Sequence, residues 1–186
     1  MKTSIKDYQN LLKVFAILLE FGAIRTQLVI DWVDTILASE EESEYAFIEL
    51  STIDKNAQSV IQILLKNCEN ASPEIVSRAV IGILGTMLKE EKVGLKTAFQ
   101  ITTHMSYEQL LTSEEQYLLY GYWDYLDFKS RDNSETFRHF TTYFNEFLSI
   151  YKDFKFENHH KWNTINEQLK PNLSNQLEVI KQNSPY

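Results

Sequence analysis

Apolar side chains recur at helical spacing along most of this 186-residue chain, and the longest such stripe is aromatic. It consists of Phe137, Phe140, Phe144, Phe147 and Tyr151, at steps of 3, 4, 3 and 4 residues. These steps place side chains on one face of an α-helix, whereas a strand alternates at every second residue. The stripe therefore predicts a helix that buries Phe140, Phe144 and Phe147 in a core.

Glycine and proline, on which most turns depend, number only five and three in the whole chain. A β-sandwich or β-barrel needs many turns, so this scarcity favours helices. It also disfavours folds that bind nucleotide phosphates on glycine-rich loops. We therefore predict an all-α fold, a single compact multi-helix bundle of about seven or eight helices.

Local signals mark two helix starts and one packing site. The triplet Ser72-Pro73-Glu74 supplies a cap, a proline at the first helical position and an acid in the first turn. Thr112 and Glu115 have the spacing of a capping box. Gly82 and Gly85 fall inside the helix expected after residue 72, where we expect them to permit close packing against a neighbouring helix.

The C-terminal segment is rich in Asn, Gln and Lys and contains Pro171. Proline interrupts helices, so we expect two short helices or a frayed tail here. We assign residues 1–156 to one helical domain. Residues 157–186 are assigned to a polar helical tail, packed on the same domain or partly frayed.

Acidic residues are concentrated in one stretch of the chain. No basic residue occurs between Arg25 and Lys55. The eight acids in this stretch carry a combined charge of −8, which equals the net charge of the whole chain. They are Asp31, Asp34, Glu40, Glu41, Glu42, Glu44, Glu49 and Asp54. One interpretation is a solvated face with helix caps. The other is an anionic docking surface that steers a basic partner, with the first six of these acids as partner-binding residues.

Aromatic residues are concentrated between Tyr117 and Trp162, where fifteen occur. Tyr120, Tyr122, Trp123 and Tyr125 point around a helix axis, so one face cannot bury them all. They form either a bulky core with tyrosine hydroxyls that reach water, or an exposed patch that anchors a protein partner. In the second case Tyr122 and Tyr125 are the candidate contact residues.

An enzymatic alternative rests on two D-x-x-D pairs, Asp31 with Asp34 and Asp124 with Asp127. If they converge, they could hold Mg²⁺ in a metal-dependent all-α phosphohydrolase. A structural helical protein is a further alternative. The four histidines lack metal-ligand spacing, and the single Cys68 is interpreted as a structural thiol. We predict no catalytic residue, no cofactor and no bound metal.

The net charge, the length of the apolar runs and the single cysteine limit the classes of partner and the compartment that we expect. An acidic chain is repelled by nucleic-acid phosphates, so we expect no nucleic-acid partner. The longest apolar run, Val14–Leu19, is far shorter than a membrane span, so we expect no membrane association. A single cysteine suits a reducing compartment, which predicts a cytoplasmic protein.

Short motifs resemble a group of small helical bacterial proteins that includes immunity proteins, which are encoded beside secreted toxins. The motifs are Gly22, Trp32-Val33-Asp34 and Ile48-Glu49-Leu50-Ser51, followed by Glu114-Glu115 and the segment 120–127. The resemblance implies a non-enzymatic protein that neutralises a toxin by binding it. Together with the acidic and aromatic residues, it predicts a protein-binding module whose partner is a toxin with a basic surface.

Overall fold

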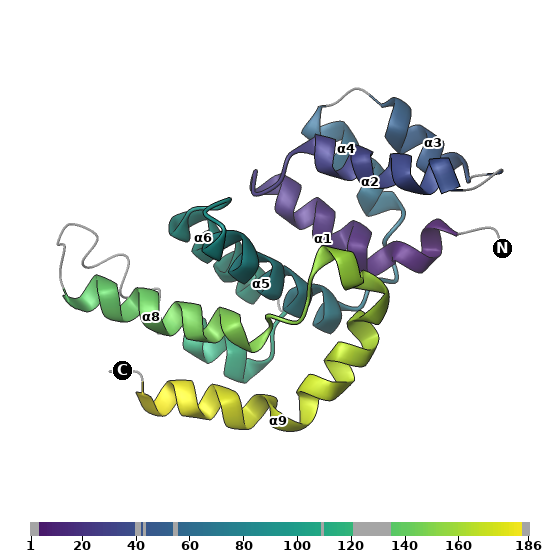
Figure 1. Ribbon diagram of the computed structural model, residues 1–186. Coiled ribbons are helices and arrows are strands. Elements are labelled where there is room, and N and C mark those ends of the chain that lie inside the picture. The colour runs from purple at the N-terminus through teal and green to yellow at the C-terminus, as the bar shows by residue number, and fades with distance from the viewer. Residues whose placement is uncertain are drawn as a thin grey trace. The chain divides into compact units, whose positions relative to one another are not determined.

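The computed structural model describes residues 4–39, 42, 44–53, 56–108, 110–120 and 135–183, with side chains in the last range from residue 138. Regular structure in these ranges is entirely helical, which confirms the all-α prediction (Figure 1). The same ranges hold nine α-helical segments, against the seven or eight expected. The chain divides into two compact units, Met1–Ser72 and Pro73–Tyr186. This division lies inside the range 1–156 that the sequence analysis treats as one domain.

The first unit is built around one helix that is buried on nearly all sides. Its elements are η1 (Ile5–Tyr8), α1 (Gln9–Glu20), α2 (Thr26–Ser39), α3 (Tyr45–Thr52) and α4 (Ala57–Lys66). Eight of the twelve residues of α1 are buried, and α1 packs against α4 while α2 packs against α3. Gly22 follows α1 with a φ of 65°, a left-handed conformation that glycine adopts without strain.

Trp32 holds α2 against three other elements of this unit. Its ring centroid lies 5.1 Å from that of Tyr8 in η1, 5.4 Å from Phe15 in α1 and 6.1 Å from Phe47 in α3. Edge-on and tilted aromatic contacts of this kind add to the free energy of burial. Trp32 therefore anchors α2 within this unit.

The second unit is organised around α5. Its elements are α5 (Pro73–Lys89), α6 (Leu95–Tyr107), a helical segment at residues 113–120, α8 (Glu135–Ile150), η2 (Phe156–Lys161) and α9 (Trp162–Asn183). The helix α5 begins at the predicted Pro73 and packs against α6, α8 and α9. All of its residues from Ile75 to Gly85 are buried, as a central helix requires.

Two glycines let α8 and the turn after it approach the α5 backbone. A Cβ atom added at Gly82 would lie 2.0 Å from the carbonyl oxygen of Tyr151. At Gly85 it would lie 3.2 Å from the Cβ atom of Leu148. The predicted packing role of both glycines is confirmed.

The aromatic stripe of α8 forms much of the core of this unit. Phe140, Phe144, Phe147 and Tyr151 are all buried, which confirms the predicted buried face. Phe99 of α6 makes edge-on contacts with Phe140 and Phe144, at centroid distances of 5.4 and 5.5 Å. The side chain of Phe137, which was predicted to begin the stripe, lies outside the described residues.

The prediction that Pro171 divides the C-terminal segment is wrong. A single helix, α9, runs from Trp162 to Asn183 with Pro171 inside it. Leu173, Leu177 and Ile180 are buried beyond the proline, and their packing outweighs the lost backbone hydrogen bond. Figure 1 shows α9 changing direction part-way along its length, as expected for a helix with an internal proline.

Candidate functional site

The predicted partner-binding acids of α2 lie in solvent. Asp31 and Asp34 are both exposed, and the side-chain amide of Gln27 donates a 2.7 Å hydrogen bond to Oδ1 of Asp31. Glu42 is also exposed. These three carboxylates are therefore accessible to a partner.

Glu44 differs because its carboxylate braces the N-terminal unit. Its Oε2 atom accepts a 3.0 Å hydrogen bond from the backbone N–H of Ile5, the first residue of η1. The side chain is half-buried, and this hydrogen bond gives Glu44 a structural role in addition to the binding role predicted for it. The remaining predicted contact residues, Glu40, Glu41, Tyr122 and Tyr125, lie outside the described residues.

Two exposed residues on α3 were missed by the sequence analysis. Tyr45 is 75% exposed and Ile48 is 44% exposed. They are three residues apart, so they are neighbours on the helix surface. Phe47 and Leu50 occupy the buried face of the same helix. The spacing of Phe47 and Leu50 indicates which side of this helix is buried, and no basic residue occurs between Arg25 and Lys55. Together these two features of the sequence could have identified the exposed pair.

The enzymatic alternative depends on the convergence of two D-x-x-D pairs. Asp31 and Asp34 are exposed on α2, whereas Asp124 and Asp127 lie outside the described residues. Within the described part of the chain, no group of three or more His, Cys, Asp or Glu residues is placed to hold a metal ion. The phosphohydrolase alternative thus gains no support from the described residues.

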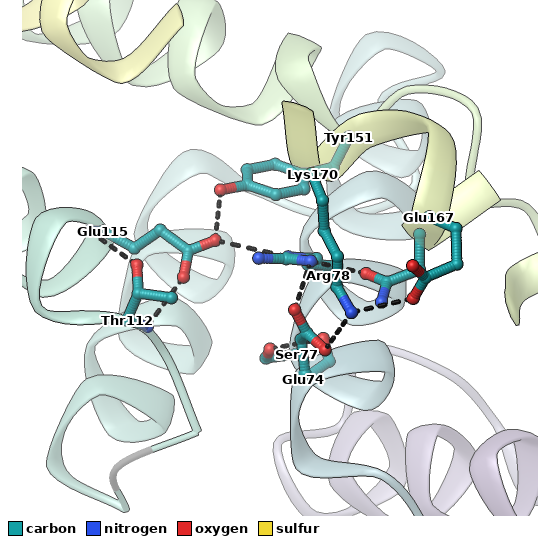
Figure 2. A network of polar contacts seen from close by, with 9 residues as sticks. Glu74, Ser77, Arg78, Thr112, Glu115, Tyr151, Glu167 and Lys170 are labelled. Atoms are coloured by element: carbon teal, nitrogen blue, oxygen red, sulfur yellow. Dashed lines mark hydrogen bonds and ion pairs between the residues drawn. The ribbon is translucent and has the colours of Figure 1, made fainter. Parts of the chain in front are cut away.

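The second unit contains a buried network of charged residues, which the sequence analysis did not predict (Figure 2). Arg78 of α5 is 2% exposed and Glu115 is 1% exposed. The Nη1 atom of Arg78 donates hydrogen bonds to Oε1 of Glu74, at 2.7 Å, and to Oδ1 of Asn166, at 2.6 Å. Its Nε atom lies 3.7 Å from Oε1 of Glu115. Arg78 thereby links α5 to α9 and to the helical segment at 113–120.

Glu115 has two partners besides Arg78. Its Oε2 atom accepts a 2.7 Å hydrogen bond from the backbone N–H of Thr112, and its own N–H donates to Oγ1 of Thr112 at 3.3 Å. This reciprocal pair is the predicted capping box, which is confirmed. Its Oε1 atom accepts a hydrogen bond from the hydroxyl of Tyr151. Both carboxylate oxygens are therefore engaged.

The network reaches the surface through Glu74 and Lys170. The Nζ atom of Lys170 lies 3.2 Å from Oε2 of Glu74 and 2.7 Å from Oε1 of Glu167. Burial pushes the pKa of Glu74 upward, but the charges of Arg78 and Lys170 outweigh it and hold the pKa below its usual value. Glu74 is therefore ionised over the neutral pH range and remains the outer partner of Arg78.

The pKa of Tyr151 is raised well above its ordinary value. Burial is the main cause, followed by the negative charge of Glu115 and the hydrogen bond to it. The tyrosine therefore stays neutral and donates its proton to the hydrogen bond. Since each buried charge has an opposite partner and Glu115 has no free oxygen, we interpret the network as a structural brace between helices.

Cys68 is buried, and its thiol lies 3.6 Å from the carbonyl oxygen of Leu65. Burial raises the pKa of this thiol, which favours the neutral form over the nucleophilic thiolate.

Among the described residues, none of the helices combines the length and apolar character that crossing a bilayer requires.

No protein-family model matches this chain, and comparisons with curated proteins and with solved structures found no match.

Proposed function

We propose that this chain is a non-enzymatic protein-binding module of the immunity type, which binds a basic toxin through the surface of α2 and α3. The observation that carries the proposal is the exposure of Tyr45 and Ile48 within an acidic stretch. We call the exposed residues Asp31, Asp34, Glu42, Tyr45 and Ile48 the acidic–apolar surface.

The two kinds of residue on this surface support different steps of binding. Exposed carboxylates attract a basic partner from a distance and raise the association rate. An exposed tyrosine and isoleucine supply apolar area that is buried on contact and slows dissociation. Because α2 and α3 pack against each other, Asp31 and Asp34 lie on a helix next to the one that carries the apolar pair, and Glu42 lies in the connection between the two helices.

The test is a binding assay with the protein encoded next to this chain's gene, purified and immobilised for biolayer interferometry. We expect a neighbouring toxin to bind, and the double variant Tyr45→Ala, Ile48→Ala to weaken binding by more than about tenfold, mainly through faster dissociation. Protection of a bacterial strain that expresses the toxin should weaken in parallel.

The matched control is Leu65→Ala on α4, because Leu65 is an aliphatic residue of the same unit with 41% exposure. It should leave binding unchanged. A neighbouring toxin that does not bind the chain would contradict the immunity assignment. Equal loss of affinity in Leu65→Ala and in the double variant would contradict the assignment of the surface.

A further inference from the structure

Pro171 lies inside α9 and weakens the connection between the residues before it and those after it. A proline has no backbone N–H, so the carbonyl group of Glu167, four residues earlier, receives no helical hydrogen bond from it. We call residues 162–170 the anchored part of α9 and residues 172–183 the strap. The two parts are attached to the rest of the second unit in different ways.

The anchored part is held by hydrogen bonds from buried side chains. Trp162 is 1% exposed, and its indole N–H donates a 3.0 Å hydrogen bond to the carbonyl oxygen of Lys155. Asn166 is also buried, and its Oδ1 atom accepts the 2.6 Å hydrogen bond from the guanidinium of Arg78. Water does not compete for a buried hydrogen bond to a charged group, so these contacts fix the anchored part firmly.

The strap is held mainly by three aliphatic side chains. Leu173, Leu177 and Ile180 are buried, whereas the other nine of its twelve residues are exposed. Every ordered residue loses conformational entropy, and exposed residues recover none of this cost through burial. The strap is therefore closer than the anchored part to the point at which ordering and burial balance.

The polar contacts of the strap with other described residues lie at the surface. The hydroxyl of Ser174 donates a 2.9 Å hydrogen bond to Oε2 of Glu114, and both side chains are exposed. The Nζ atom of Lys181 lies 4.8 Å from the centroid of the Tyr117 ring. A further ion pair, between Lys181 and Glu178, lies within the strap itself. Water competes with exposed contacts of this kind, so they add little to the attachment.

A detached strap does not remain a helix. Isolated helices of about twelve residues are marginal in water even when their sequence is favourable. Asn172, Ser174 and Asn175 are poor helix formers, and alanine is absent from residues 172–183. Detachment is therefore a local unfolding event, in which the helix is lost together with its packing.

We propose that residues 172–183 form a strap that detaches from the second unit by local unfolding, with Pro171 as the hinge, while the rest of the unit stays folded. Detachment exposes the buried face of the strap and Leu118, which lines a small cavity together with Leu177. The acidic–apolar surface belongs to the other unit, so this proposal and the proposed toxin binding can fail independently.

The first experiment measures amide hydrogen exchange of the full chain by NMR, in urea concentrations below the unfolding transition. We expect the amides of residues 175–180 to share one opening equilibrium, populated at least about tenfold more than the opening of residues 166–169 and of α5. Exchange of the strap only through global unfolding, at the same rate as α5, would overturn the proposal. A steady gradient of protection from residue 183 back into α9 would indicate fraying of a helix end and would also overturn it.

The second experiment tests the hinge with Pro171→Ala. Alanine restores a backbone donor for the carbonyl group of Glu167 and couples the strap to the anchored part, so the opening of residues 175–180 should become at least about tenfold rarer. Gln168→Ala is the matched control, because it is an exposed position of the anchored part where no backbone donor is missing. It should leave the exchange of the strap unchanged. An unchanged or more frequent opening in Pro171→Ala, or an equal change in both variants, would contradict the role of Pro171 as the hinge.

Discussion

The hydroxyl of Tyr151, at the end of α8, donates a hydrogen bond to Oε1 of Glu115, which lies 36 residues earlier in the chain. The same carboxylate caps a helix through Thr112 and faces the guanidinium of Arg78. One buried side chain therefore ties together three helical segments. The loss of folding stability caused by a substitution therefore depends on which partner of Glu115 it removes.

Removal of Arg78 should be the most damaging single change in this network. Arg78→Met leaves the buried carboxylate of Glu115 without its counter-charge, and we expect the free energy of unfolding to fall by about 3–5 kcal/mol. The double variant Arg78→Met, Glu115→Gln removes both charges and should lose less than the sum of the single changes. Urea denaturation followed by circular dichroism measures each value.

The exposed end of the network supplies the control. Lys170 pairs with Glu74 and Glu167 at the surface, where water screens the charges, so Lys170→Met should leave stability nearly unchanged. If Arg78→Met were as mild as Lys170→Met, the network would not be a structural brace.

Stability should fall at alkaline pH because of Tyr151. Its folded-state pKa is raised by burial and by Glu115, so the folded protein holds this proton more tightly than the unfolded chain does. The stabilisation is complete below the unfolded pKa of about 10 and is lost progressively as pH rises above it. Denaturation measured from neutral pH to above that value should show this decline.

Tyr151→Phe provides the comparison, since phenylalanine keeps the ring but cannot ionise. This variant should be less stable at neutral pH by about 1–3 kcal/mol, because Glu115 loses a hydrogen-bond donor. Its stability should also decline less between neutral and alkaline pH than that of the parent. Parallel declines in both proteins would rule out Tyr151 as the cause.

Gly82 should tolerate no side chain. Gly82→Ala places a Cβ atom 2.0 Å from the backbone oxygen of Tyr151, so α5 and the end of α8 must separate. We expect a loss of about 1–3 kcal/mol or more in thermal or urea unfolding. Gly85→Ala, with its closest contact at 3.2 Å from the Leu148 Cβ atom, should cost less.

Gly94 is the matched control for this series. A Cβ atom there meets nothing within 4 Å, and its φ of −78° suits any residue. Gly94→Ala should therefore change stability little. A similar loss of stability in Gly82→Ala and Gly94→Ala would show that replacing any glycine has this effect. The close approach of Tyr151 to α5 would then not be its cause.

Local signals in the sequence predicted the features that depend on neighbouring residues. The start of α5 at Pro73, the Thr112–Glu115 capping box and the buried stripe from Phe140 to Tyr151 each follow from spacing within one helix. The hydrogen bond from the Tyr151 hydroxyl to Glu115 could not be predicted in this way, because it is the packing of α8 that brings Tyr151 next to Glu115. Pro171 shows the reverse case, in which tertiary burial beyond the proline overrides a local rule.

For the acidic–apolar surface too, the sequence could predict only the features that depend on neighbouring residues. The absence of basic residues near Asp31 and Asp34 is enough to predict that both acids are exposed, because a carboxylate is rarely buried without an opposite charge. The spacing of Phe47 and Leu50 fixes the buried side of α3, and this leaves Tyr45 and Ile48 exposed. The role of Glu44 depends on the N–H of Ile5, 39 residues away, and no local pattern encodes that contact.

Charge reversal on the acidic–apolar surface should slow the association of a basic partner. We expect Asp31→Lys, Asp34→Lys and Glu42→Lys together to lower the association rate constant by about tenfold or more at low salt, with little change in dissociation. All three side chains are exposed, so each substitution should alter folding stability by less than about 0.5 kcal/mol. Stopped-flow or biolayer kinetics with the neighbouring-gene toxin measures both rate constants.

The control must separate a local surface from the net charge of the whole chain. Glu108→Lys, Glu157→Lys and Glu178→Lys make the same change in total charge at exposed positions of the other unit. This triple variant should slow association less. Exposed charges are screened beyond a Debye length of about 8 Å at physiological salt, so added salt should slow the parent more than the reversed variant. Association rates that respond to neither salt nor the reversal of Asp31, Asp34 and Glu42 would show that these acids form a solvated face with no part in binding.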